Sequence, residues 1–169
     1  MFSIGDYVVK SNEGVCRIED QVFMKGFDRE EKPYFMLVPI ADARAKLYIP
    51  VEAEQQIVRP VMTEQEAMEL IGRVDEIECT VIENDKVREK TYKEALHSND
   101  PEQLVGVIKS VFLRSEARRG AGKKATVVDE RCFKAAESAL YSELGFVLKK
   151  EKEEVRKLIM ETASAKKNA

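Results

Sequence analysis

Hydrophobic and polar residues alternate over short distances in the first sixty positions of the chain. The apolar runs are rich in β-branched and aromatic residues, and turn-forming segments separate them at 11–14, 26–29 and 41–44. Five strands in 60 residues are too few for a wide sandwich but enough for a small closed sheet, so we predict an SH3-like β-barrel over residues 1–60. The predicted strands are 7–9, 15–18, 21–24, 34–38 and 46–49.

The spacing of apolar residues becomes helical from residue 63 onwards. Thr63 and Glu66 have the spacing of a capping box, in which two side chains bond the amides that begin a helix. Asp100 and Pro101 predict another helix start, because proline suits the first helical position, and Thr126 predicts a third. Two further helices are expected, over about 84–96 and after residue 150. Predicted core positions include Ala67, Leu70, Ile71, Val87, Tyr92, Ala95, Leu104, Val105, Val111, Phe112, Ala136 and Leu140.

The chain places its predicted strands first and its predicted helices afterwards. Because strands and helices do not alternate, we do not expect a parallel sheet with crossover helices. We expect an α+β chain of two separately built units. We therefore predict a β domain at 1–60, an all-α domain of about five helices at 63–165, and a polar tail at 166–169 that frays.

Composition adds that the exterior is densely charged. Hydrophobic residues make up 44% of the chain and charged residues 35%, with a net charge of -3. No window holds the roughly 18 apolar residues of a membrane span, and the first ten residues do not resemble a secretory leader. We expect a cytoplasmic protein that is not a general polyanion binder.

Candidate catalytic chemistry is sparse. The cysteines, Cys16, Cys79 and Cys132, lack the close spacing of a zinc site or a disulfide framework, and the single histidine, His97, lies in a turn-rich segment. The glycine-rich run at 120–124 is too short for a phosphate-binding loop. We therefore expect no metal, no cofactor and no enzymatic activity.

Several short motifs occur in an order that is similar to a known family. They include Gly5-Asp6 followed by Val8-Val9, Gly14-Val15, Tyr34 to Leu37, Tyr48 to Val51, Val58-Arg59-Pro60 and, late in the chain, Leu140 to Leu144. In this order they resemble the CarD/CdnL family of bacterial RNA polymerase-binding transcription regulators. The resemblance covers nearly the whole chain, and its motifs are structural rather than catalytic.

The resemblance implies two interaction surfaces. It implies a Tudor-like N-terminal domain that binds the β subunit of RNA polymerase, and a helical domain that touches promoter DNA. A partner strand can add to an exposed sheet edge through backbone hydrogen bonds, with side-chain contacts beside it. The polymerase-contacting positions expected on the corresponding strands are Phe23, Met24, Lys25, Lys46 and Tyr48.

A basic stretch in the helical half is the candidate DNA surface. Residues 86–124 hold ten basic and five acidic residues, a local charge of +5 in a negative chain. Such a surface gains affinity for phosphates by releasing condensed counterions. The alternative is a solvated helix end whose cations suit the helix dipole. The candidate DNA contacts are Lys86, Arg88, Arg114, Arg118, Arg119, Lys123 and Lys124.

The chain departs from the family at one position. Regulators of the better-known type carry a tryptophan that wedges into the minor groove, and this chain contains no tryptophan. By spacing, the corresponding place is close to Asn84, Asp85 and Lys86, where a carboxylate would repel phosphate. Tyr92 is a substitute aromatic or, at its helical spacing, a core residue.

Three functions remain in view. The leading hypothesis is a transcription regulator that docks on the polymerase β subunit, modulates initiation and lies near upstream promoter DNA, so that it is nucleoid-associated. The alternative is a protein adaptor on polymerase without DNA contact, and an enzyme is the third. The sequence leaves the oligomeric state open.

Overall fold

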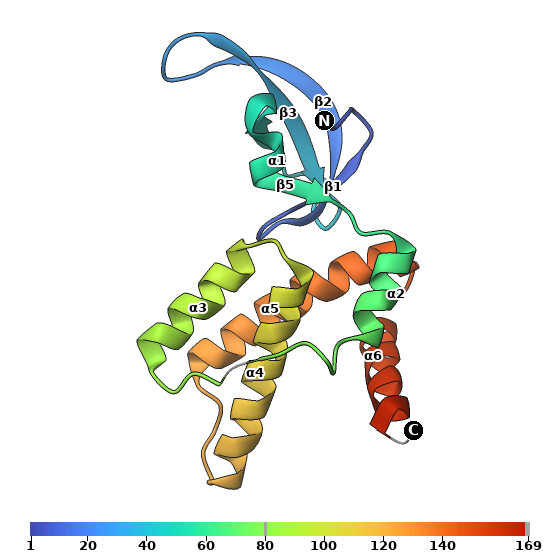
Figure 1. Ribbon diagram of the computed structural model, residues 1–169. Helices are drawn as coiled ribbons and strands as arrows, with labels where there is room; N and C mark the ends of the chain where they lie inside the picture. The colour runs from blue at the N-terminus through green and yellow to red at the C-terminus, as the bar shows by residue number, and fades with distance from the viewer. Residues whose placement is uncertain (80, 168–169) are drawn as a thin grey trace. The chain divides into compact units, whose positions relative to one another are not determined.

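The computed structural model describes residues 1–79 and 81–167. The chain divides into two compact domains, Met1–Val61 and Met62–Ala169 (Figure 1), and each is described by itself. The first holds an antiparallel five-stranded sheet and the second is helical, so the predicted α+β class is confirmed.

The N-terminal domain is built on one antiparallel sheet. Its strands are β1 (Tyr7–Lys10), β2 (Gly14–Lys25), β3 (Glu31–Pro39), β4 (Leu47–Pro50) and β5 (Val58–Pro60), in the order β4-β3-β2-β1-β5. Within the described residues β4 and β5 do not pair with each other, so the sheet stays open and the predicted barrel closure is not confirmed. The chain joins these two edge strands through a 3-10 turn, η1 (Val51–Ala53), and a short helix, α1 (Glu54–Ile57).

Two predicted strands are one strand in the structure. The segments 15–18 and 21–24 both belong to β2, whose register with β3 shifts between Ile18 and Asp20. A bulge of this kind inserts one residue and bends the strand, which explains why the alternation of apolar residues is interrupted there. The core of the domain lies on one face of the sheet and consists of Val8, Cys16, Ile18, Phe35, Leu37, Ile49 and Val58.

The second domain contains five helices within the described residues. They are α2 (Glu64–Gly72), α3 (Asp85–His97), α4 (Pro101–Gly120), α5 (Val127–Leu148) and α6 (Lys152–Lys167). The capping box of Thr63 and Glu66 is formed, and the side chains of Asp100 and Thr126 accept amide hydrogen bonds at their helix starts. These three predicted helix starts are confirmed. The predicted fraying of the tail concerns 166–169, of which 168–169 lie outside the described residues.

The helical core confirms most of the predicted positions but not all. Tyr92, 2% exposed, is a core residue. Val87 and Phe112 are more than half exposed, so their predicted burial is wrong. Arg88 is buried on α3 and Val107 on α4, although neither was predicted, while Tyr92 and Val111 are buried as predicted. The inward faces therefore overlap the predicted stripes and differ from them at their margins.

Candidate functional site

A two-stranded ribbon extends the sheet beyond its central part. β2 pairs with β3 along its length as far as Lys25, whereas β1 pairs with β2 only between Gly14 and Arg17 (Figure 1). In the part of the chain that the structure describes, no strand pairs with Asp20–Lys25 on the side away from β3. That side of β2 is an accessible strand edge, called here the open edge.

The hydrogen-bond alternation tells which backbone groups the open edge presents. The amide of Gly26 donates to the carbonyl of Glu30 at 3.1 Å, and hydrogen-bonded and non-hydrogen-bonded pairs alternate along an antiparallel ladder. Phe23 and Pro33 are then a non-hydrogen-bonded pair. The N–H and C=O groups of Gln21, Phe23 and Lys25 consequently point away from β3 and form the open edge.

Pro33 blocks the opposite edge of the same ribbon. Since the pair with Phe23 is not hydrogen-bonded, the nitrogen of Pro33 faces away from β2, and β4 begins to cover β3 only at Tyr34. Proline has no N–H, and it is tolerated in strands where this missing donor faces an edge. The ribbon therefore offers a continuous set of donors on its β2 side and an interrupted one on its β3 side.

The five side chains predicted to contact polymerase are exposed. Phe23 is 65% exposed, Tyr48 43% and Met24 36%, and the side chains of Lys25 and Lys46 are exposed as well. They do not form one patch, because successive residues of a strand point to opposite faces. By register, Phe23 and Lys25 lie on the core side of the sheet, where Phe35 is buried, and Met24 and Tyr48 lie on the other side.

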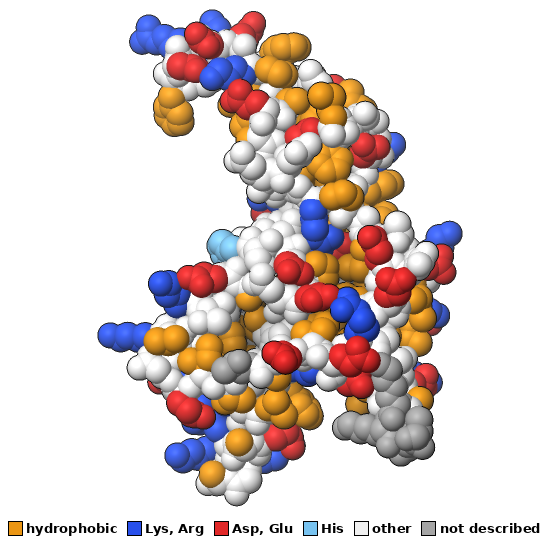
Figure 2. All heavy atoms as spheres, in the orientation of Figure 1, with side chains coloured by type: hydrophobic (Ala, Val, Ile, Leu, Met, Phe, Trp, Pro, Cys, Tyr) orange, Lys and Arg blue, Asp and Glu red, His pale blue; other side chains and the backbone are white. Residues whose placement is uncertain are grey.

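Further apolar residues share the face of Met24 and Tyr48. By register these are Val22, Tyr34 and Met36, which are half-buried. Figure 2 shows hydrophobic side chains gathered over the N-terminal domain and charged side chains of both signs at the end of the ribbon. Sequence alternation alone could not find this face, because the bulge in β2 reverses the inward and outward positions.

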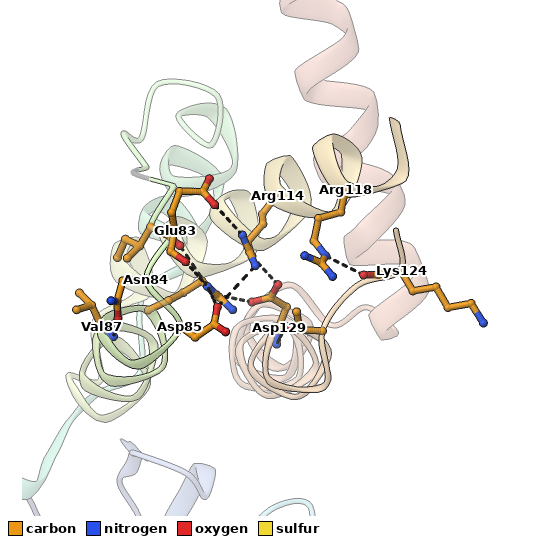
Figure 3. Close-up of polar contacts among 11 residues, drawn as sticks. Glu83, Asn84, Asp85, Val87, Arg114, Arg118, Lys124 and Asp129 are labelled. Carbon is orange, nitrogen blue, oxygen red and sulfur yellow. Dashed lines mark hydrogen bonds and ion pairs between the residues drawn. The ribbon is translucent and has the colours of Figure 1, made fainter. Parts of the chain in front are cut away.

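The centre of the predicted DNA surface is a buried ion cluster (Figure 3). Asp129, fully buried, accepts from Nε of Arg88 at 2.8 Å through Oδ1 and from Nε of Arg114 at 2.9 Å through Oδ2. Both arginines are less than one-tenth exposed. This burial contradicts their predicted role as phosphate contacts, because in the folded domain both guanidinium groups are occupied inside the protein.

Two exposed carboxylates extend the cluster, so that three carboxylates face two guanidinium groups. Asp85 lies 2.9 Å from Nη1 of Arg88, and Glu83 lies 3.3 Å from Nη1 of Arg114. Burial acts to lower the pKa of Arg88, but hydrogen bonds with Asp85 and Asp129 outweigh it, and the pKa is raised above its usual value. The cluster thereby fixes the segment before α3 to α4 and α5.

The remaining predicted DNA contacts differ in how exposed they are and in whether they bind other parts of the chain. Nε of Arg118 donates to the carbonyl of Lys124 at 2.8 Å, so this arginine holds the turn between α4 and α5. Arg119 pairs with Glu116 at 3.0 Å but stays 76% exposed. Lys123 is exposed, and the side chain of Lys124 points away from the cluster in Figure 3.

The place of the missing tryptophan is the first turn of α3. Asn84 caps this helix by accepting from the amide of Val87 at 3.1 Å, Asp85 pairs with Arg88, and Lys86 is exposed. In Figure 3 the side chain of Val87 points away from the ion cluster. The burial of Tyr92 excludes it as a substitute wedge.

Metal-binding arrangements are not found in the described parts of the chain. Residues 1–79 and 81–167 contain no group of three His, Cys, Asp or Glu side chains that could hold a metal ion. The cysteines are unbridged. None of the helices described is both long enough and apolar enough to cross a membrane.

Comparison with known proteins finds a match for the N-terminal part of the chain. A family model described as the CarD-like/TRCF RID domain matches residues 2–62, which coincide with the sheet-containing domain. No curated protein matches the chain.

Proposed function

We propose, from the match of residues 2–62 to the CarD-like/TRCF RID domain family, that the chain is a transcription regulator that docks on the β subunit of RNA polymerase and modulates initiation. The domains of this family are RNA polymerase β-interacting domains. The matched region ends where the sheet-containing domain ends, so the proposed docking function rests on this domain alone.

The observation that carries the proposal is the open edge of β2. Its backbone groups at Gln21, Phe23 and Lys25 can accept an added strand from polymerase, which would supply directional hydrogen bonds. Phe23 on one side and Met24 on the other would flank the added strand with apolar contacts. Lys25 would pair with acidic side chains of the partner. Lys46 and Tyr48 lie at the other side of β3, so they would meet the partner by side-chain contacts away from the added strand.

We further propose that the helical domain lies near upstream promoter DNA. The exposed cations that remain for this role are Lys86, Arg119, Lys123 and Lys124. Because docking on polymerase gives these side chains a high effective concentration near DNA, weak phosphate contacts suffice. The contacts are non-specific, since lysine and arginine bound to phosphates carry no sequence information.

A protein adaptor without DNA contact is the second candidate function. The burial of Arg88 and Arg114 favours it, because two of the seven predicted cations are withdrawn from the surface. The absence of tryptophan favours it as well, because a valine or an aspartate at the start of α3 cannot replace lost base stacking.

The deciding experiment compares two substitutions at one position of the open edge. Phe23→Pro removes the edge-facing amide without removing a hydrogen bond to β3, whereas Phe23→Ala keeps the amide and removes the ring. Binding to a purified polymerase β lobe is measured for both variants and for the native chain. Strand addition predicts that Phe23→Pro loses at least tenfold more affinity than Phe23→Ala. This is roughly the effect of losing one hydrogen bond and leaving the partner's carbonyl without a donor.

Charge reversal at Lys25 and Lys46 provides an independent readout on the same lobe. Lys25→Glu and Lys46→Glu should weaken binding in a salt-dependent manner while circular dichroism stays unchanged. If native affinity persists in Phe23→Pro and Lys25→Glu, the polymerase site is not at the open edge, and native affinity in Lys46→Glu removes the proposed side-chain contact beside β4. If the native chain does not bind the lobe at all, the proposed function is wrong.

A further inference from the structure

The open edge of β2 is self-complementary in its backbone groups. It presents the N–H and C=O groups of Gln21, Phe23 and Lys25, at equal intervals on either side of Phe23. When two such edges meet antiparallel, with Phe23 opposite Phe23 of a second copy, Gln21 of each copy lies opposite Lys25 of the other. Every edge-facing donor and acceptor of both copies is then hydrogen-bonded. Shifting this register places one end of the edge opposite the bulge of β2 or the turn that follows it.

The length of the open edge fits the length of a second ribbon. Before β1, the carbonyl of Asp6 accepts from the amide of Ile18 at 2.9 Å, and the amide of Gly5 donates to the carbonyl of Ile18 at 2.7 Å. These bonds cover β2 up to Ile18. In the symmetric register, Gly26 of the second copy lies opposite Asp20, and the second chain turns back towards its own β3 there. The second ribbon therefore ends before it meets Gly5 and Asp6.

The side chains beside the open edge favour the same pairing. Phe23 is 65% exposed, and in this register its ring lies next to the same ring of the second copy on one face of the sheet. On the other face, Met24 lies opposite the half-buried Val22 of the second copy. Aromatic and aliphatic pairs of this kind stabilise antiparallel strands. Natural sheets often protect a free edge with charged residues or proline, and residues 21–24 contain neither.

The charged residues that flank this uncharged segment have opposite signs. Asp20 precedes it and Lys25 follows it, and both side chains are exposed. An antiparallel arrangement places the acidic end of each copy beside the basic end of the other, whereas a parallel arrangement would place like charges together. Because like charges on facing strands are destabilising, the charges select the antiparallel orientation.

From the symmetric edge, its matching length and its complementary charges, we infer that a second copy of this chain binds the open edge, with β2 antiparallel to β2 about Phe23. The pairing itself does not depend on the proposed function. Its consequence does, because the second copy and a polymerase strand would occupy the same backbone groups. Self-pairing and docking on polymerase are therefore mutually exclusive, and the paired form is a reserve that cannot dock.

Cysteine crosslinking of the full chain tests the register. Facing residues of a hydrogen-bonded pair have Cα atoms about 5.5 Å apart, which a disulfide spans. Phe23→Cys should therefore form a covalent dimer on oxidation, in a Cys79→Ser background that removes the native thiol that is not buried. Met24→Cys is the matched control, because the two copies of this diagonal position lie about 7–8 Å apart, and it should crosslink at least tenfold more slowly. Equal rates, or no dimer of Phe23→Cys, would overturn the inference.

Sedimentation velocity of the chain without polymerase measures the same pairing reversibly. Because short interfaces are weak, the native chain should change from monomer to dimer between about 10 µM and 1 mM. Phe23→Pro removes the central amide of both copies and should weaken the dimer at least tenfold, with circular dichroism unchanged. A native chain that stays monomeric over this range contradicts the inference and leaves docking on polymerase standing.

Addition of the purified polymerase β lobe to the dimer tests the mutual exclusion. The lobe should dissociate the dimer and give complexes with one copy of each partner. A complex in which the lobe is bound to an intact dimer would show that the two partners do not share the edge. A lobe that leaves the dimer untouched and does not bind the monomer refutes the proposed function, while the self-pairing is upheld by the crosslink.

Discussion

Nε of Arg88 lies 2.8 Å from Oδ1 of Asp129, and both side chains are almost completely buried. This pair links α3 to α5, and Arg114 adds α4 through the second carboxylate oxygen. One aspartate therefore holds three helices through two guanidinium groups. Such a cluster stabilises only while every member is present, because a single remaining buried charge is costly.

Asp129→Asn should accordingly destabilise the helical domain. The asparagine leaves two buried arginines without their shared anion, and we expect the free energy of unfolding to fall by about 3–5 kcal/mol. Urea unfolding followed by circular dichroism measures this. Glu130→Gln, the exposed neighbour on the same helix, is the matched control and should change stability by less than about 0.5 kcal/mol. Equal stabilities of the two variants would refute the structural role.

Gly145→Ala should also be destabilising, although alanine favours helices. A Cβ at this position would lie 2.6 Å from the carbonyl oxygen of Lys150, where the chain reverses after α5. Lys149 adopts a left-handed conformation there, and the amide of Lys150 donates to Gly145. We expect a loss of about 1–3 kcal/mol from the forced backbone shift.

Gly106→Ala is the control for that substitution. Its Cβ would meet the carbonyl of Glu78 at 3.8 Å, an ordinary contact, so the helix propensity of alanine should dominate and stability should rise by up to about 1 kcal/mol. Thermal unfolding of both variants tests the difference. A stabilised Gly145→Ala variant would show that the chain reversal tolerates a side chain.

Tyr92 predicts a pH dependence of stability. Burial and the nearby Asp129 raise its pKa from 10.0 to about 12, so between these values the unfolded chain loses the proton and the folded chain keeps it. The stability contribution of the protonated tyrosine is complete below pH 10 and is lost as the pH rises towards 12. Relative to Tyr92→Phe, the native chain should lose about 1 kcal/mol by pH 11. If the free energy of unfolding of the two proteins changed with pH in the same way, the predicted contribution of Tyr92 would be excluded.

The cysteines should react in a defined order. Cys79 is half-buried, whereas burial raises the pKa of Cys16 to about 11 and also raises the pKa of Cys132. Since the thiolate is the reactive form, iodoacetamide at pH 8 should label Cys79 well before the other two. Mass spectrometry of a timed reaction measures this, and urea should equalise the rates. Early labelling of Cys16 would mean that the sheet opens readily.

DNA contact is tested by salt dependence within a polymerase–promoter complex. If Lys123 and Lys124 each neutralise one phosphate, the double variant Lys123→Gln, Lys124→Gln should reduce the slope of log affinity against log salt by about 2. The double variant Lys150→Gln, Lys157→Gln, two exposed lysines outside the basic stretch, is the control. An unchanged slope with intact polymerase binding would favour the adaptor function.

The sequence predicted helix starts better than the faces of helices and strands. Thr63, Asp100 and Thr126 act through hydrogen bonds within one turn, so local spacing is enough to find them. The orientation of α3 depends instead on a partner 41 residues away, because Arg88 is buried by Asp129. The sequence did contain a signal for the buried face of α3, namely the i, i+4, i+7 spacing of Arg88, Tyr92 and Ala95.

The sequence predicted where the apolar segments of the sheet lie, but it did not predict how the strands pair. The bulge between Ile18 and Asp20 joins two predicted strands into β2, and such a bulge is defined by the partner strand rather than by the residues themselves. β5 (Val58–Pro60) carries a family motif but is too short for an alternation pattern. The open edge likewise follows from where β1 ends, a property of strand pairing that no single segment encodes.

Pro33 restricts strand addition to one side of the ribbon. A strand can lengthen the sheet on the β2 side, but the missing amide prevents the same growth on the β3 side. If two copies paired through the open edges of their β2 strands, each would fill the other's free hydrogen-bonding edge. No suitable edge would remain for a third copy, so a filament could not grow along the ribbon. The residue that leaves one side available for a partner also protects the other from fibril formation.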